Sequence, residues 1–204
     1  LEFAFLSGTA IVDGKQAAIS NIDARVANGT LGGAITLGWD EKQFRAQGEL
    51  NLKGADLAQL LPAFTREFQS TGLLELTTKF SSQGTTLDEL FNAPAASSTF
   101  SAIKGTLNNI DLVRAIQSRS KTPQRGGRTP FNEITGDAQA SGGRLALRNL
   151  KLVSGPMNGS GSVDVGAGGE LSGRLDLVLS AQTTVVARGV LQLGGSLKDP
   201  QLSQ

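Results

Sequence analysis

The sequence from Phe131 to Gly195 alternates apolar and polar residues, and glycine-containing turns interrupt this alternation about every 12 residues. A period of two places successive side chains on opposite faces of a strand, so the pattern predicts hairpin-connected antiparallel strands. A sheet of this kind has one apolar face, and the function depends on what covers it. Five strands are expected, over Phe131 to Ala140, Leu145 to Val153, Gly159 to Val165, Leu171 to Leu179 and Val185 to Leu193.

The amino-terminal part has the same period, with tight turns expected at Asp13-Gly14 and Asn28-Gly29. The chain contains 26 glycines, against about 14 at a usual frequency of roughly 7%. Because the glycines lie between apolar strands, we interpret them mainly as turn residues. Three short helices, each beginning with an Asp or Thr that can cap it, are expected over Asp56 to Phe64, Thr86 to Asn92 and Asp111 to Gln117.

The strand and Asp-capped helix around Leu52 to Leu61 are repeated in plan around Leu107 to Ile116, which favours an elongated sheet over a closed barrel. Three short helices and few aromatic residues leave little material for a second layer. The sequence therefore predicts one mainly β domain over residues 1–204. We expect an elongated, curved antiparallel sheet with a partly open apolar groove and a few short helices.

The composition excludes several classes of function. Lys and Arg number 19 against 18 Asp and Glu, so nothing indicates nucleic-acid binding. Cysteine and histidine are absent, and the acidic residues are scattered, so no metal and no cofactor is expected. The chain begins at Leu1 inside strand-like sequence and has no apolar stretch of about 20 residues, which suggests a fragment whose membrane anchor lies outside it.

Motifs for catalysis are weak. Ser118 and Lys121 satisfy the S-x-x-K pattern of penicillin-binding proteins, but its partner motifs are missing. Glycine runs such as Gly159-Ser-Gly161 lead into strands, whereas a phosphate cradle needs a helix start. A carboxylate-based glycan hydrolase is a distant alternative, because sequence spacing cannot locate its acid and base. We expect a protein that is not an enzyme.

The apolar strand faces are the candidate binding surface. As the lining of a groove they would contact a lipid, and as a protein core each would contribute about 1.5 to 3 kcal/mol when buried. The sequence leaves both open. The candidate residues are Leu145, Leu147, Leu171, Leu175, Leu177, Leu179, Val185, Leu191 and Leu193.

A second candidate surface is basic. The segment from Ser118 to Arg128 contains no apolar side chain, so a mobile loop is expected. Together with Arg114, the loop has five cations, and the sequence contains no acidic residue between Asp111 and Glu133. These cations could bind anionic lipid headgroups or an acidic partner, or they could simply be solvated. The loop cations are Arg119, Lys121, Arg125 and Arg128.

Several elements in a fixed order resemble the carboxyl-terminal region of AsmA-like proteins of the Gram-negative envelope. The resemblance is densest after Gly105, and it rests on the order and spacing of the elements rather than on any single one. The elements are Gly105-x-Leu107-x-x-Ile110-Asp111-Leu112, Thr129-x-Phe131, Gly143 before Leu145 and Leu147, Gly159-x-Gly161-x-Val163-Asp164-Val165 and Gly195-Ser196-Leu197-x-x-Pro200.

The resemblance implies a strongly curved sheet with an apolar concave face, in a periplasmic protein anchored in the inner membrane. It also implies a role in outer-membrane biogenesis, with phospholipid moving along the groove, and it brings no catalytic residues. The leading hypothesis is therefore a non-enzymatic lipid-binding β-groove. The alternative is a structural module whose sheet edges pair with envelope proteins, for example during outer-membrane protein assembly. The oligomeric state is left open.

Overall fold

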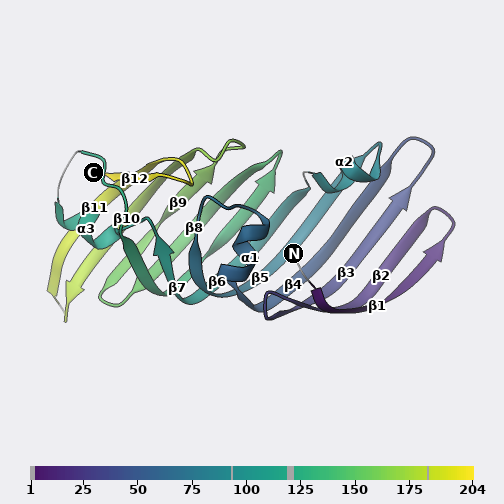
Figure 1. Cartoon of the computed structure of the whole chain (residues 1–204), viewed down its shortest axis with the longest axis horizontal. Coiled ribbons are helices and arrows are strands. Elements are labelled where there is room, and N and C mark those ends of the chain that lie inside the picture. Colours follow the sequence, from purple (N-terminus) through teal and green to yellow (C-terminus); the bar gives the residue numbers. More distant parts are fainter. Residues whose placement is uncertain (1–2, 93, 119–121, 183) are drawn as a thin grey trace.

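The computed structural model describes residues 3–92, 94–118, 122–182 and 184–204, and it forms one antiparallel sheet of twelve strands in chain order (Figure 1). Nearly every strand is joined to the next by a turn or a short helix, so the sheet grows along one long axis. The strands are β1 Phe3–Asp13, β2 Gln16–Val26, β3 Gly29–Trp39, β4 Phe44–Asp56, β5 Ser70–Gly84, β6 Ala95–Asn108, β7 Arg128–Ser141, β8 Arg144–Ser154, β9 Met157–Val165, β10 Leu171–Ala181, β11 Thr184–Gly195 and β12 Pro200–Ser203.

The predicted fold class is confirmed. The expected strands after Phe131 correspond to β7 to β11, each within a few residues of its predicted bounds. The sheet is not closed into a barrel, because β1 pairs with β2 and β12 with β11 at opposite ends of the strand order. Both predicted turns are present, with positive φ at Gly14 and Asn28 (56° and 64°).

The three predicted helical segments are confirmed, and their caps follow the sequence. The Ala58 N–H donates to Asp56 Oδ1 (2.9 Å), and the Arg114 N–H donates to Asp111 Oδ1 in the same way (2.9 Å). The Glu89 N–H donates to Thr86 Oγ1 (3.2 Å), as the capping pattern predicts. The helices are α1 Leu57–Leu60, extended by the 3-10 turn η1 Leu61–Ala63, α2 Leu87–Asn92 and α3 Leu112–Ser118.

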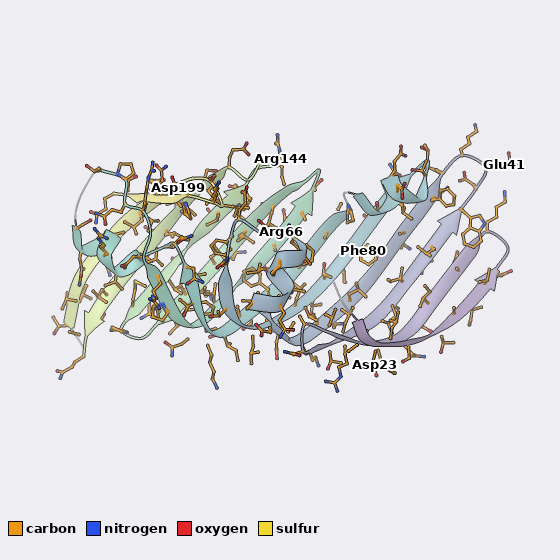
Figure 2. All side chains as sticks on the ribbon, in the orientation of Figure 1. Asp23, Glu41, Arg66, Phe80, Arg144 and Asp199 are labelled. Atoms are coloured by element: carbon orange, nitrogen blue, oxygen red, sulfur yellow. The ribbon has the colours of Figure 1, made fainter. Side chains whose placement is uncertain are left out.

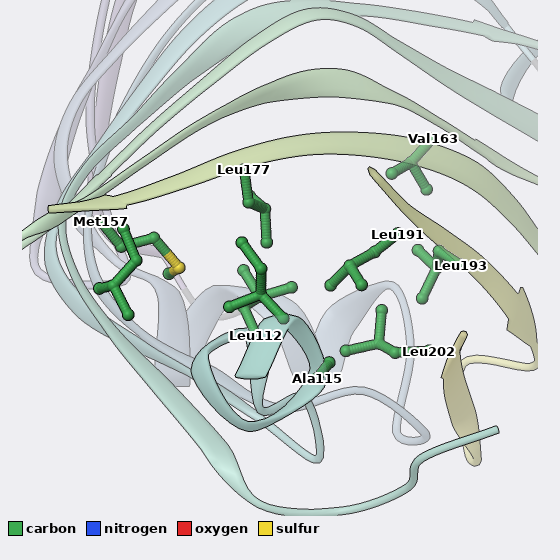
Figure 3. Close-up of a cluster of buried hydrophobic side chains, with 10 residues drawn as sticks. Leu112, Ala115, Met157, Val163, Leu177, Leu191, Leu193 and Leu202 are labelled. Atoms are coloured by element: carbon green, nitrogen blue, oxygen red, sulfur yellow. The ribbon is translucent and has the colours of Figure 1, made fainter. Parts of the chain in front are cut away.

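The two faces of the sheet differ in chemistry, and β5 shows the difference most clearly. Its exposure alternates residue by residue: Leu74, Leu76 and Phe80 are half-buried on one face, while Glu75 and Lys79 are exposed on the other. α1 and α3 pack on the apolar face, and Figure 3 shows the strands curving around α3. We call this side the concave face and the opposite side the outer face.

Four of the bulges that interrupt the alternation are of one kind and fall on every second strand from β2 to β8. At each of these bulges one residue has a positive φ, and two residues oppose one on a neighbouring strand. A bulge of this kind bends the strand and increases its twist, so the repeat contributes to the curl of the sheet. The bulge residues are Asn21 (φ 52°), Gly54 (66°), Lys104 (52°) and Asn149 (52°).

The interpretation of the glycines as mainly turn residues is incomplete. Gly48 lies within β4 on the concave face, where a Cβ would approach Ala34 O to 2.5 Å and Phe80 Cε1 to 2.9 Å. The ring of Phe80 thus occupies the space above a bare backbone, and the missing side chain lets the concave face curve tightly. The same arrangement recurs where Phe100 covers Gly136 and Phe131 covers Gly105.

The largest buried cluster lies at the carboxyl-terminal end, beneath α3 (Figure 3). Leu112, Ala115 and Ile116 of α3 are 2 to 3% exposed and face apolar side chains of the sheet. The side chain of Gln204 fixes the far end of α3 by donating to the Ala115 and Ile116 carbonyls (3.0 Å each). The sheet residues of this cluster are Met157, Val163, Leu177, Leu179, Leu191, Leu193 and Leu202.

Candidate functional site

A row of ten non-polar residues crosses the concave face at right angles to the strands. Each member is the register partner of the next, so the row continues from β1 to β10 without a polar side chain. At about 4.8 Å per strand its nine steps span about 43 Å. The row, which we call the central row, consists of Ala10, Ile19, Ile35, Gly48, Phe80, Ala96, Ala140, Leu145, Val165 and Leu171.

A neighbouring row runs parallel to the central row from β2 to β12. Its only polar side chains are Thr78 and Ser98, and these satisfy one another through a hydrogen bond from Ser98 Oγ to Thr78 Oγ1 (2.8 Å). No residue of either row is charged. The members are Ile22, Gly33, Leu50, Thr78, Ser98, Ala138, Leu147, Val163, Gly173, Leu193 and Leu202.

The helices cover the concave face unevenly. α1 packs on Val26, Leu52 and Ala55, and α3 packs on the carboxyl-terminal cluster. α2 packs on the same face at the opposite long edge, where Ser82 Oγ donates to the Leu90 carbonyl and Leu90 is 2% exposed. Between α2 and the other two helices, a set of half-buried side chains on β2 to β6 belongs to none of the three buried clusters. We call this set the open strip, and it consists of Ile19, Ile35, Leu37, Leu50, Phe80 and Phe100.

Trp39 ends the open strip at one long edge of the sheet. It is half-buried, shares the face of Ile35 and Leu37, and pairs with Phe44 across β3 and β4. Its backbone N–H donates to the Lys15 carbonyl (2.9 Å), which ties two turns of this edge together. The chain has one tryptophan, so its fluorescence reports on this end of the strip alone.

The turn after Trp39 is ordered by Asp40. Its Oδ1 accepts hydrogen bonds from the backbone N–H groups of Lys42 (2.9 Å) and Gln43 (3.0 Å), and its Oδ2 binds Arg45 (2.5 Å). The Lys42 N–H, together with the Gln43 N–H and the Arg45 guanidinium, holds the pKa of the Asp40 carboxyl below its ordinary value. Figure 2 shows charged residues at the two long edges, with Glu41 and Arg144 on one side, Asp23 on the other and Phe80 between them.

Four of the predicted groove residues lie in the buried cluster beneath α3. Leu177 is 1% exposed and Leu191 is fully covered, while Leu179 and Leu193 are also buried. Here α3 occupies the concave face where a ligand would otherwise lie. These four side chains serve as protein core in this structure.

The other predicted groove residues divide further. Leu145 is half-buried in the central row, away from the α3 cluster. Leu147, Leu171 and Leu175 are half-buried and pack against that cluster, and Leu171 also belongs to the central row. The expectation that Val185 shares the face of Leu191 and Leu193 is wrong. Val185 pairs with Ser180 although Ala187 pairs with Leu179, so one extra residue shifts the alternation, and Val185 is 51% exposed.

The basic segment is partly tied down, contrary to the expectation of a mobile loop. The backbone of Gln124 exchanges two hydrogen bonds with Leu202 (2.7 and 2.9 Å), so this segment pairs with β12. Arg125 forms an ion pair with Asp199 (2.9 Å), an acid that is distant in sequence. Arg128 begins β7 and is exposed, whereas Arg119 and Lys121 lie outside the described residues.

Sequence reasoning missed the open strip on β2 to β6. Its signal was present, because Ile35 and Leu37 alternate in β3 and Leu50 lies in an alternating segment of β4. The prediction placed the binding surface on the leucine-rich segments after Leu145 because they contain more large aliphatic side chains. Four of those leucines, Leu177, Leu179, Leu191 and Leu193, are buried beneath α3, whereas the strip with less leucine is left open.

The geometry defines a class of protein: an open, curved antiparallel sheet with an apolar concave face. The match of residues 10–150 to the AsmA family model shows that the chain belongs to the AsmA family, which is a family of envelope proteins. No curated protein and no solved structure matches the chain. No helix among the described residues is long and apolar enough to cross a membrane, and the same residues contain no group of three or more acidic side chains that could hold a metal.

Proposed function

We propose that this chain is a non-enzymatic periplasmic module that binds phospholipid acyl chains and supports lipid transport and outer-membrane biogenesis. The observation that carries the proposal is the central row, in which ten non-polar residues follow one another along the sheet. An anchor in the inner membrane would be provided by sequence outside this chain. Membership of the AsmA family supports a role in the envelope.

An acyl chain suits the open strip for physical reasons. The strip offers aliphatic and aromatic side chains that are half-buried in the free protein, and covering apolar area gains about 25 cal/mol per Å². It contains no charged group and no polar group that contact with a hydrocarbon would leave unpaired. The strip follows the long axis, so a chain could change position stepwise while meeting the same kind of surface.

The phospholipid headgroup would remain at the polar edge of the groove. Trp39 lies where the apolar strip meets the turn from Asp40 to Gln43, and tryptophan suits such a boundary because its ring is apolar and its N–H is polar. The exposed side chains of Arg114 and Arg128, near α3, offer a second contact for an anionic headgroup.

The test uses Trp39 as a reporter. Phospholipid brominated on its acyl chains is added to the protein, because bromine quenches tryptophan on contact. We expect strong quenching by brominated lipid, little by the same lipid without bromine, and a protein-lipid complex in native mass spectrometry. Lipid binding without quenching would place the ligand elsewhere on the chain, and no co-purified or added lipid bound would reject the proposal.

A second function is favoured by a separate observation. The edge strand β1 is exposed and apolar on both faces, which suits pairing with another polypeptide strand. In that case the chain would be a structural module that assists outer-membrane protein assembly through its sheet edge. The concave face would then remain free of lipid in the test above, and Trp39 would not be quenched.

A further inference from the structure

The segment between η1 and β5 crosses the concave face instead of following an edge of the sheet. α1 and η1 lie on this face, and residues 64–69 then pass above the strands before the chain returns to Ser70 at the start of β5 (Figure 1). Figure 2 shows Arg66 between the two long edges of the sheet. We call residues 64–69 the strap.

The strap contacts a part of the sheet that is distant in sequence. A Cβ on Gly169, in the turn between β9 and β10, would lie 3.4 Å from Glu67 Oε2 and 3.8 Å from Leu197 Cδ1. The Leu197 N–H donates to the Gly169 carbonyl (2.9 Å), so this turn and the loop before β12 support the strap together. The strap therefore spans the concave face from α1 and η1 to the β9–β10 turn.

Phe64 begins the strap and faces the sheet, yet it belongs to no buried cluster. Its N–H donates to the Leu61 carbonyl (2.9 Å), which closes the 3-10 turn and places the two side chains on the same side. Leu61 is half-buried against the cluster around Phe131, so this side faces the sheet. Phe64 is nevertheless 73% exposed, more than any other large apolar side chain in the described part of the chain. Water therefore reaches its ring where a packed side chain would be expected.

Short side chains lie on the concave face of β6 and β7, next along these strands from the cluster that Leu61 contacts. They are half-buried, and none belongs to a buried cluster. Larger side chains flank them, with Phe80 on β5 and Leu145 and Leu147 on β8. Phe64 follows Leu61 by one 3-10 turn, about 6 Å at about 2.0 Å per residue, in the direction of these short side chains. We call the set the small patch, and it consists of Ala96, Ser98, Ala138 and Ala140.

We propose that the strap is the roof of the lipid path, and that an acyl chain on the small patch is covered by the ring of Phe64. The inference rests on the proposed function and adds to it the residue that closes over the ligand. A hydrocarbon between the ring and the patch would bury apolar area on two sides, whereas the open strip covers it on one side. The other residues of the strap are polar or half-buried, so Phe64 is its exposed apolar contact.

The first experiment moves the fluorescent reporter from Trp39 to the strap. Phe64→Trp in a Trp39→Phe background carries a single tryptophan at a position that is exposed in the free protein. Phosphatidylethanolamine should shift its emission to shorter wavelength, because the indole leaves water, and the same lipid brominated on its acyl chains should quench it. Leu73→Trp in the same background, on the outer face at a side chain that is 44% exposed, is the matched control and should show neither effect.

The second experiment changes the two sides of the lipid path separately. Phe64→Ala should leave the melting temperature unchanged, because the ring is exposed, and should raise the dissociation constant for phosphatidylethanolamine about tenfold. Phe64→Leu keeps an apolar contact and should restore most of the affinity. Ala138→Leu fills the small patch, so it should weaken lipid binding by a similar factor without loss of stability. Leu73→Ala is the control and should bind lipid as the unmodified chain does.

The outcomes separate this inference from the proposed function. Quenching of Trp39 in the unmodified chain, without quenching of Phe64→Trp, would overturn the roof and leave the acyl chain in the open strip. Failure of both reporters would reject the proposed function and the inference together. Equal quenching of Leu73→Trp would show unspecific contact with lipid and would also overturn the inference.

The variants without a reporter give two further outcomes. Normal lipid binding by Phe64→Ala would show that the ring does not touch the ligand. A large fall in the melting temperature of Ala138→Leu would show that the small patch is already filled by packing in the free protein. Either result would overturn the inference, and circular dichroism of each variant confirms that it is folded.

Discussion

The hydroxyl group of Thr129 accepts a hydrogen bond from the backbone N–H of Leu112 at 3.0 Å, which fixes the first residue of α3 against the start of the strand β7. The same hydroxyl donates to the Ile110 carbonyl at 2.7 Å. Thr129 is 1% exposed, so water cannot replace either partner. One threonine therefore holds α3 in the concave face at the end where the groove is filled.

Replacing Thr129 with valine keeps the side-chain shape and removes both hydrogen bonds. The buried Leu112 N–H and Ile110 carbonyl would lose their partner, so we expect the free energy of unfolding to fall by about 1 to 3 kcal/mol. Urea unfolding measures the loss. Thr71→Val, at an exposed threonine of β5, is the control and should change it by less than about 0.5 kcal/mol. Equal effects would show that α3 is held by packing alone.

A second prediction concerns the glycines of the concave face that lie beneath aromatic rings. Gly48→Ala should destabilise the protein by about 1 to 3 kcal/mol, because the new methyl group meets the Ala34 carbonyl and the Phe80 ring. Gly32→Ala is the matched control, since its Cβ meets Ile22 O at 3.4 Å, and it should be neutral or stabilise by up to about 1 kcal/mol. Thermal melts of both variants compare the sites. A tolerated Gly48→Ala would contradict the role of bare backbone in the curvature.

The sequence was sufficient for the strands, their order and the helix caps, because these depend on local patterns. Alternation identified β7 to β11, and Asp56, Thr86 and Asp111 cap the helices as their positions predict. The bulges were not predictable, because a residue such as Lys104 with positive φ has no strong local signal. Each bulge shifts the alternation by one, which is why Val185 was assigned to the wrong face.

The division between core and open strip is a tertiary property. Leu177 and Ile35 look alike in sequence, since each alternates with polar or small neighbours within a strand. What distinguishes them is where α3 packs, and that depends on the curl of the whole sheet and on distant contacts such as Gln124 with Leu202. Alternation identifies an apolar face without showing which part of it remains uncovered.

The turn at Asp40 should make stability depend on pH. Because the folded-state pKa of Asp40 lies below its ordinary value of 3.8, its contribution is present above that value and is lost as pH falls through the lowered pKa. We expect the difference in melting temperature between the unmodified protein and Asp40→Asn to be constant from pH 7 to pH 5 and to shrink below about pH 3.8. Glu41→Gln in the same turn is the control. A difference that persists at pH 2.5 would mean that the neutral side chain stabilises the turn equally.

The sharpest prediction places one carboxylate at three positions. Leu177→Asp buries an unpaired charge beneath α3, so it should cost more than the roughly 2 to 5 kcal/mol of a leucine-to-alanine change in a core. Leu37→Asp lies in the half-buried open strip, where the carboxylate can reach water, and should cost about 1 kcal/mol or less. Leu73→Asp, at a side chain of the outer face that is 44% exposed, is the control for charge alone.

The order of the three variants in lipid binding should differ from their order in stability. Leu37→Asp should retain near-normal melting and lose bound phospholipid, because an acyl chain would have to cover a charge. Leu73→Asp should keep both stability and lipid, and Leu177→Asp should lose its fold at the α3 end. Melting temperatures and co-purified lipid, measured on the same preparations, give the comparison. If Leu37→Asp melts as low as Leu177→Asp, the strip is core, and if it binds lipid as well as Leu73→Asp does, the acyl chain lies elsewhere.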